Sequence, residues 1–369
     1  MRDAGRLDMR HHAIDIMTQF AERTGITGER AQRRYLWTDA FAVCNFLGFH
    51  RETDDAMYLE LARRLVDRVH HTLGHHRSDD PRTGWISGLS DEDGDAHPTL
   101  GGLRIGKSLP ERAPGEPLDE RLEWERDGQY FHYLTKWMHA LDQLARSTGD
   151  IRLGVWAREL ADTAHRRFTY GDPPTRMYWK MSIDLSRPLV GSTGHHDPLD
   201  GFVTCAELAA TSPGGPDLRD AQRDFAAMID RRALATADPL GIGGLLFDAH
   251  CAACLHVDGA LVEMLLAAAE LGLRQYVDGP ELHAPAADRL AFRELGLAIG
   301  LGAIAAMEPA VTARFARYLP LRDQLPAFWL RSDHRRTRPW IEHADINDVM
   351  LATSLVPDGF VTLYGLTGR

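Results

Sequence analysis

The chain has 369 residues and a formal net charge of −11, with 44% hydrophobic and 26% charged residues. This is the composition of a globular protein with enough apolar material for one large domain or two ordinary ones. The acidic balance excludes a general nucleic-acid binder, which needs a basic face.

Neither a leader nor a membrane span is expected from the hydropathy pattern. The first six residues are polar and no apolar segment follows them. The longest apolar stretch, 295–307, is shorter than the roughly 20 residues that cross a bilayer. We therefore expect a cytoplasmic protein with no membrane partner.

Apolar residues recur with a period of 3.6 along most of the chain, which predicts about twelve helices separated by short Gly, Pro and Asp segments. Convincing strands are scarce, and the best candidates are 177–181 and 360–364. The predicted helices lie near 7–24, 33–49, 54–74, 129–148, 151–169, 198–211, 216–232, 241–255, 258–272, 284–306, 309–319 and 345–355.

The predicted helices are of two kinds. Segments such as 54–74, 151–169 and 216–232 carry one apolar stripe and many charges, as helices that touch water do. Segments 37–47, 241–255 and 295–307 are apolar nearly all round, which predicts buried helices. Such an alternation suits two concentric rings of helical hairpins.

This pattern resembles the (α/α)6 toroid of the six-hairpin glycosidase superfamily, which also includes sugar epimerases of the N-acylglucosamine 2-epimerase kind. The resemblance is one of architecture, because no catalytic motif of a named family matches. It implies an all-α fold, an (α/α)6 barrel formed as one domain over 1–369, with long loops over one end. It also implies a sugar-sized cleft at that end, although fold alone does not fix function.

Residues Gly101 to Ser108 match the P-loop pattern G-x-x-x-x-G-K-[ST]. A P-loop needs a buried strand before it and a helix after it, and then binds nucleotide with magnesium. The preceding residues 91–98 are polar, and Pro110 follows three positions after Lys107. A P-loop ATP- or GTP-binding protein therefore remains only an alternative prediction.

Only three of the 42 basic residues are lysines: Lys107, Lys136 and Lys180. An ammonium is a compact charge whose pKa is easily tuned, whereas a guanidinium is a fixed fork. We expect at least one of these lysines to line a functional pocket. The four cysteines include Cys251 and Cys254 in a C-x-x-C spacing, but no second pair accompanies them, so neither a metal nor a cofactor is expected.

The irregular segment 75–128 is far longer than an ordinary connection and is predicted to be an ordered active-site loop folded over a cleft. Its candidate substrate-binding residues are Arg104, Lys107 and Trp124, and its candidate catalytic residues are Glu123 and Asp127. A cationic Gly-rich loop in an acidic protein favours an anionic substrate.

Two segments after this loop add further candidates. The helix near 129–148 carries His132 and Lys136 on the face opposite its apolar ridge, where a solvent-exposed face would carry Arg and Glu. The segment 176–184 is rich in aromatic and charged residues suited to a sugar ring, with Lys180 and Asp184 expected to pair; its candidate binding residues are Tyr178, Trp179, Lys180 and Asp184.

Several aspartates stand where a helix begins. Asp197 and Asp238 each precede a proline, which predicts helix N-caps and removes both from the catalytic candidates. His196 and Asp200 stay as candidate substrate-binding residues. Asp39 opens an otherwise apolar helix, so it either caps that helix or serves a site.

We predict a carbohydrate-active or related small-molecule enzyme with glycoside hydrolase-like chemistry. Hydrolysis needs two carboxyl groups, for which Asp127 with Asp39 is the preferred pair. The alternative is a sugar epimerase, isomerase or lyase that uses His132, His196 or a lysine for proton transfer. A non-catalytic helical scaffold is a third possibility, whose polar stripes would bind nothing.

Overall fold

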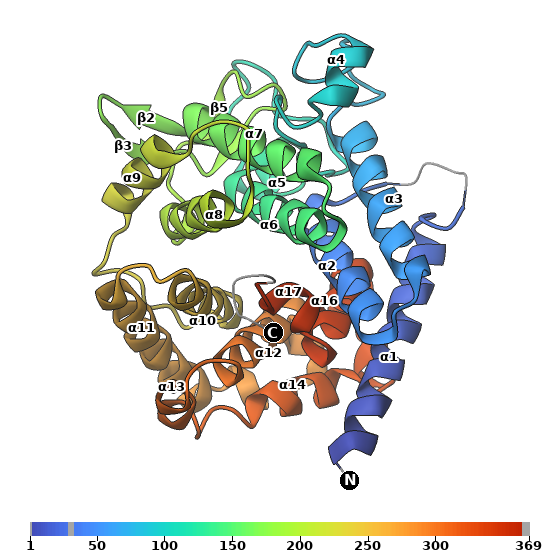
Figure 1. Ribbon diagram of the computed structural model, residues 1–369, viewed down its shortest axis with the longest axis vertical. Helices are drawn as coiled ribbons and strands as arrows, with labels where there is room; N and C mark the ends of the chain where they lie inside the picture. Colours follow the sequence, from blue (N-terminus) through green and yellow to red (C-terminus); the bar gives the residue numbers. More distant parts are fainter. Residues whose placement is uncertain (1, 29–32, 364–369) are drawn as a thin grey trace. The chain divides into compact units, whose positions relative to one another are not determined.

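A computed structural model describes residues 2–28 and 33–363. In this part of the chain α-helices dominate, and the strands are short (Figure 1). The helices are α1 (Arg2–Arg23), α2 (Leu36–Thr53), α3 (Ala56–Leu73), α4 (Asp91–Ala96), α5 (Glu120–Glu123), α6 (Phe131–Thr148), α7 (Ile151–Phe168), α8 (Asp197–Thr211), α9 (Arg219–Met228), α10 (Pro239–Cys254), α11 (Gly259–Asp278), α12 (Ala291–Ala305), α13 (Pro309–Arg314), α14 (Leu321–Trp329), α15 (Arg338–Glu342), α16 (Ala344–Leu355) and α17 (Asp358–Val361). The strands are β1 (Gln129–Tyr130), β2 (Thr169–Gly171), β3 (Pro174–Met177), β4 (Lys180–Met181) and β5 (Pro188–Val190).

The prediction of an all-α chain is confirmed, and each of the twelve predicted helices has a counterpart within a few residues, apart from the late start of α12. Sequence analysis missed α14, because Pro326 inside it signals a break and not a helix. The predicted strand 360–364 is wrong: Phe360 lies in α17, and Tyr364 lies outside the described residues. Apolar β-prone residues there pack as a short helix because they are buried on all sides.

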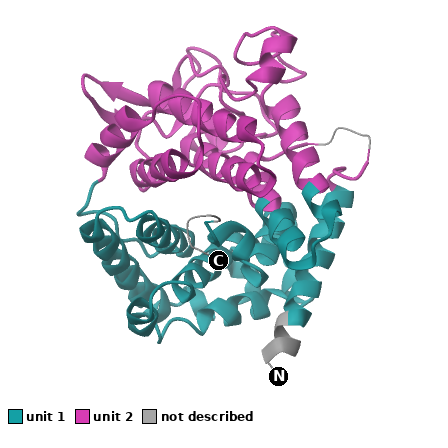
Figure 2. Cartoon of the chain, viewed as in Figure 1, with its two compact units in different colours: residues 1–23, 44–59, 230–369 teal, residues 24–43, 60–229 magenta. Residues whose placement is uncertain are grey.

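Two compact units make up the chain (Figure 2). Unit 1 comprises residues 1–23, 44–59 and 230–369, and unit 2 comprises residues 24–43 and 60–229. Each unit therefore combines separate stretches of the sequence. A single domain over 1–369 stays a prediction.

In unit 1, helices α10, α12 and α16 form the interior, while α11, α14 and α1 pack against them. Nearly every residue of α12 from Glu294 to Leu301 is buried, as expected for a helix without a polar face. In α11 the buried residues recur as Leu261, Leu265, Leu266 and Ala269, which is the stripe of an outer helix. The predicted contrast between buried and half-exposed helices is thus present inside this unit.

Unit 2 is organised around α6, which packs against α7 and α8, while α9 covers α8. Strand β1 leads directly into α6 and pairs antiparallel with β4, which pairs in turn with β5. Strands β2 and β3 form a separate two-stranded ribbon after α7. No helix in the described part of the chain combines the length and apolarity that crossing a bilayer requires.

Small residues allow α10 and α12 to approach closely. A Cβ atom added to Gly243 would lie 2.2 Å from the backbone oxygen of Gly296, and one added to Gly300 would lie 2.5 Å from that of Gly243. Because backbone atoms cannot move aside as a flexible side chain can, these glycines are required by packing. Gly244, one residue further along α10, has nothing within 4 Å of its added Cβ.

The two neighbouring glycines give a matched test of this contact. Gly243→Ala is expected to lower the free energy of unfolding by about 1–3 kcal/mol through overpacking. Gly244→Ala is expected to leave it unchanged or to raise it by up to about 1 kcal/mol, since alanine favours helix over glycine. Urea unfolding followed by circular dichroism measures both, and equal effects of the two substitutions would contradict the close helix contact.

Candidate functional site

The segment that matches the P-loop pattern forms a cradle for an internal carboxylate. Asp127 is fully buried, and its Oδ1 accepts hydrogen bonds from the backbone amides of Gly106 at 2.9 Å, Lys107 at 3.2 Å and Gly128 at 3.1 Å. The guanidinium of Arg104 donates to Oδ2 at 2.6 Å. Asp127 thus occupies the amides that a phosphate would otherwise use.

The P-loop alternative is corrected by this local structure. No strand precedes Gly101 and no helix follows Ser108 within the described residues 97–119. Gly106 has a φ of 93°, and an added Cβ would lie 2.0 Å from the backbone oxygen of Arg34. Glycine is therefore required at the second glycine of the pattern because φ is positive there and the backbone of Arg34 lies close by. A nucleotide is not needed to explain it.

Arg104 and Arg77 complete the surroundings of Asp127. Arg104 also donates to the backbone oxygens of Thr72 and His75, at the end of α3. Arg77 lies 3.3 Å from Asp127 Oδ2 and donates to the backbone oxygens of Lys107 and Ser108. Arg104, which we expected to bind substrate, is 6% exposed and fully engaged within the protein.

Asp39 and Glu123, the other carboxylates expected to be catalytic, are also engaged. Asp39 accepts a hydrogen bond from the backbone amide of Tyr35 at 3.2 Å, which caps the start of α2, and lies 3.6 Å from Arg34. Glu123 accepts from Lys180 Nζ at 2.9 Å and from Arg112 Nε at 3.0 Å, and it is 3% exposed.

Lys180 is completely buried and donates to the backbone oxygens of Glu123 and Arg126 as well as to the Glu123 carboxylate. Burial lowers the pKa of Lys180, and the contact with Glu123 opposes that shift. The expected pair of Lys180 with Asp184 is not formed. Lys180 instead fixes the short helix α5 to the sheet that precedes α6.

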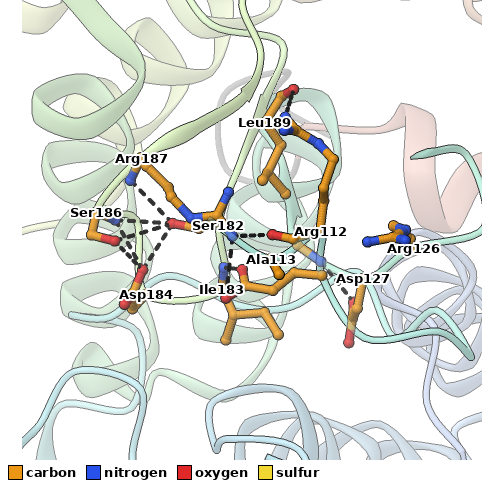
Figure 3. A network of polar contacts seen from close by, with 12 residues as sticks. Arg112, Ala113, Arg126, Asp127, Ser182, Ile183, Asp184, Ser186, Arg187 and Leu189 are labelled. Carbon is orange, nitrogen blue, oxygen red and sulfur yellow. Dashed lines mark hydrogen bonds and ion pairs between the residues drawn. The ribbon is translucent and has the colours of Figure 1, made fainter. Parts of the chain in front are cut away.

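The 182–187 turn ties the long segment 75–128 to the sheet (Figure 3). Asp184 accepts hydrogen bonds from Ser182 and Ser186 and pairs with Arg82 at 2.7 Å. Burial opposes ionisation of Asp184, yet these hydrogen bonds and Arg82 hold its pKa at about 2.

Arg112 in the long segment fastens it to β5 by donating to the backbone oxygen of Leu189 at 2.9 Å (Figure 3). In return, Arg187 donates to the backbone oxygen of Arg112. The prediction that 75–128 is ordered agrees with these contacts. Its role over a cleft stays a prediction.

A run of aromatic rings leads across unit 2 toward the start of α6. Neighbouring ring centroids lie 4.7–5.6 Å apart along this aromatic run. Trp124 is 51% exposed at one end of it. The members, in order of contact, are Trp124, Trp179, Tyr130, Tyr133 and Tyr35.

Lys107 lies at the other end of the aromatic run. Its Nζ is 5.6 Å from the centroid of the Tyr35 ring, and it makes no hydrogen bond or ion pair within residues 33–363. Burial lowers the pKa of Lys107, and the nearby Glu125 opposes this. Tyr178, by contrast, stacks on Tyr170 at 4.3 Å in the β2–β3 ribbon and is not part of the run.

His132 stands in the first turn of α6, between the aromatic run and the first turn of α8. Its ring stacks near Tyr130 at 5.3 Å and near Trp179 at 6.1 Å. Its Nδ1 lies 3.6 Å from Asp197 Oδ1, and the two side chains are 24% and 6% exposed. Neither His132 Nδ1 nor Asp197 Oδ2 has a hydrogen-bond partner in the described part of the chain.

The protonation states of these two groups differ from their usual ones. Burial lowers the pKa of His132 to about 4, with Asp200 opposing and Lys136 adding to the shift. Burial and the charge of Asp200 raise the pKa of Asp197 well above its ordinary value, and Lys136 opposes this. A neutral imidazole beside a carboxyl group that tends to hold its proton suits proton transfer.

Lys136 and Asp200 border this pair one turn further along their helices. Lys136 Nζ donates to Asp200 Oδ1 at 3.3 Å, and both side chains are 11% exposed. His196 occupies the N-cap position of α8 and lies beside His195, 4.3 Å away between ring centroids. The structure therefore brings together three predicted residues, His132, Lys136 and Asp200.

Asp197 is the residue that sequence analysis dismissed. We expected it to cap α8, but the helix begins at Asp197 itself, and His196 at the N-cap makes no side-chain capping bond. Asp238 does cap α10, by accepting from the Gly241 amide at 3.1 Å. The missed signal is the one-turn spacing of Asp197 and Asp200, which matches that of His132 and Lys136 on the facing helix.

Within the described residues, no group of three or more His, Cys, Asp or Glu side chains is arranged to hold a metal ion. Cys251 and Cys254 form no disulfide, and burial raises the pKa of Cys254.

No protein-family model and no curated protein sequence matches the chain. Solved structures do match the chain in fold. A sugar epimerase from a ruminal bacterium has a TM-score of 0.57 at 10% sequence identity, covering 95% of this chain and 98% of the other. The cellobiose 2-epimerase of Spirochaeta thermophila has a TM-score of 0.55 at 14% identity, covering 96% and 98%.

The likeness extends over nearly the whole chain. It confirms the predicted fold class, because the chain shares the helical fold of these two structures. At such low identity the fold is what is shared.

The cradle around Asp127 predicts a large loss of stability on Asp127→Asn. Arg104 then loses its counter-charge while Arg77 keeps only Asp79, and we expect a decrease of about 3–5 kcal/mol in the free energy of unfolding. Asp79→Asn removes the exposed partner of Arg77 and should cost less than about 1 kcal/mol. Chemical denaturation of both variants tests this, and a mild effect at Asp127 would show that the cradle does not need its charge.

The pKa of His132 is testable directly by NMR of its ring nitrogens and carbons. We expect the neutral form down to about pH 4. Because an unfolded histidine takes up its proton near pH 6.5, the contribution of His132 to stability should be lost as the pH falls from about 6.5 to about 4. His132→Gln should remove this part of the acid sensitivity. A resonance that titrates near 6.5 would contradict the buried neutral imidazole.

Proposed function

We propose that the chain is a carbohydrate-active enzyme of the epimerase or isomerase kind, which moves a proton at the sugar carbon next to a carbonyl group. The observation that carries this proposal is the neutral His132 imidazole with an unpartnered Nδ1 facing Asp197. The sugar epimerases of similar fold support the choice of substrate class.

In this proposal, Nε2 of His132 takes the proton from the carbon, and the electron pair moves to the carbonyl oxygen to give an enediolate. Nδ1 keeps its hydrogen toward Asp197 Oδ1, which is an acceptor oxygen for the imidazolium that forms. Returning the proton to the other face of the carbon gives an epimer, and returning it to the neighbouring carbon gives an isomer. A residue lowered in pKa to about 4 is a weak base in the resting enzyme, so we expect substrate binding and Asp197 to strengthen it.

The aromatic run gives the apolar face of a sugar ring a place to stack, at Trp179 and Trp124. Lys136 and Asp200 offer a donor and an acceptor for hydroxyl groups beside His132. Lys107, without an ion pair in the described chain, supports the expectation that the substrate carries a carboxylate, phosphate or sulfate group.

The expected hydrolytic pair, Asp127 with Asp39, supports this proposal less well. The carboxylate of Asp127 accepts hydrogen bonds from five donors inside the protein. Asp39 caps its own helix beside Arg34. A general acid or nucleophile must reach the glycosidic oxygen or the anomeric carbon. We therefore favour proton transfer by His132 over hydrolysis as the reaction of this chain.

Incubation in heavy water tests the reaction class. With a panel of neutral and anionic aldoses, deuterium should enter the carbon next to the carbonyl, as followed by NMR of the sugar. His132→Ala should lower the exchange rate by about 10²- to 10⁴-fold, the usual contribution of a general base. His97→Gln, which removes an exposed imidazole, serves as the control with unchanged exchange. Release of an aglycone without deuterium in the sugar would favour hydrolysis and overturn the proposal.

A further inference from the structure

A pocket lies on unit 2, and its lining includes neither His132 nor Asp197. It has a volume of about 430 Å³ and is lined by residues of α3, the 85–98 segment, the end of α6 and the start of α7. None of its lining residues belongs to the aromatic run or to the candidate site described above. Its volume lies within the range of small-molecule pockets.

His70 forms part of the wall of this pocket and is only 2% exposed. Its Nε2 lies 3.2 Å from the indole Nε1 of Trp137, which is always a donor. Nε2 must therefore be the acceptor, and Nδ1 must carry the ring hydrogen. Burial lowers the pKa of His70 to about 3, so the ring stays neutral in this tautomer.

The Nδ1–H donor of His70 has no hydrogen-bond partner among the described residues. This nitrogen is not one of the fully buried polar atoms that lack a partner, so it keeps some contact with solvent. The donor thus opens onto the pocket, and a fixed, neutral, unpaired N–H in a nearly buried ring is suited to an acceptor oxygen of a ligand.

Aromatic rings form the walls beside His70. Trp156 meets it edge-on at 5.2 Å and is held in place because its indole donates to the backbone oxygen of Ala96 at 2.8 Å. Trp85 also lines the pocket and packs on His75, with 4.1 Å between ring centroids. Two fixed indoles near one polar donor are typical of a site for the C–H faces of a sugar.

Charges at the rim nearly balance. Arg152 pairs with Asp150 at 2.7 Å, and His71 hydrogen-bonds to Asp95 at 3.2 Å. Arg63 makes no hydrogen bond or ion pair within the described chain, and the carboxylate of Asp67 is 70% exposed. Donors and acceptors of both signs favour a neutral ligand with many hydroxyl groups over an anion or a cation.

We propose that this pocket is a second binding site for a neutral polyhydroxylated molecule of mono- or disaccharide size, held by His70 Nδ1–H, Arg63 and Asp67 between Trp85 and Trp156. Such a site is independent of the proposed reaction, since it shares no residue with the His132–Asp197 pair. The pocket binds ligand and carries out no chemistry.

Ligand-observed saturation-transfer NMR on the full chain tests the site, with D-glucose and sucrose as neutral probes and inorganic phosphate and glucuronate as charged ones. Glucose or sucrose should bind saturably in the millimolar range. Asp67→Trp, which fills the pocket from an exposed position, should abolish this binding. Arg63→Ala should weaken it about tenfold, the usual effect of losing a hydrogen bond to a charged group. Arg166→Ala, an exposed arginine of α7 outside the pocket, is the matched control and should bind normally.

Each remaining outcome contradicts the inference. Sugar binding that survives Asp67→Trp would belong to another site. Binding of phosphate or glucuronate alone would assign the pocket to anions. Absence of saturable binding by either neutral probe would show that the pocket holds only water.

Discussion

The charge of Asp127, buried without solvent, is the constraint on which unit 2 depends. A buried carboxylate is tolerated only when hydrogen bonds and counter-charges surround it. Here three backbone amides and two arginines do so, and Arg104 extends the same network to the end of α3. Asp127 lies just before β1 and α6, so this network fixes where α6 begins and thereby where His132 stands.

Helix α6 then serves two separate regions with two of its faces. His132 and Lys136 face Asp197 and Asp200 of α8. Trp137, roughly 140° further round the helix from His132, donates a hydrogen bond to His70, and His70 lines the pocket on unit 2. Both regions contain a neutral histidine, but burial acts on them differently: His132 keeps an accessible edge, whereas His70 offers one donor to an enclosed space.

The candidate site was only partly foreseeable. The unusual stripe on α6 predicted His132 and Lys136, because His and Lys stand where an ordinary solvent face carries Arg and Glu. His196 and Asp200, which flank the Asp197-Pro198 step, were left as candidates once capping had been assigned to Asp197. Asp127 and Glu123 were predicted to be catalytic and Lys180 to bind substrate, and all three have partners inside the protein. Local sequence cannot distinguish a carboxylate that meets substrate from one that meets a distant arginine, since both are acids in an apolar setting.

The sequence by itself determined that the chain is helical, where its helices run and which of them are buried, because periodicity and the distribution of charge act over one or two helical turns. It also determined that Lys107 and the glycines around it are special. Only the tertiary structure decided what they do: the amides cradle Asp127, and Gly106 makes room for the backbone of Arg34. The reason is physical, since the partners of these groups are brought near by packing between segments about twenty to seventy residues apart, and no local pattern records such distances.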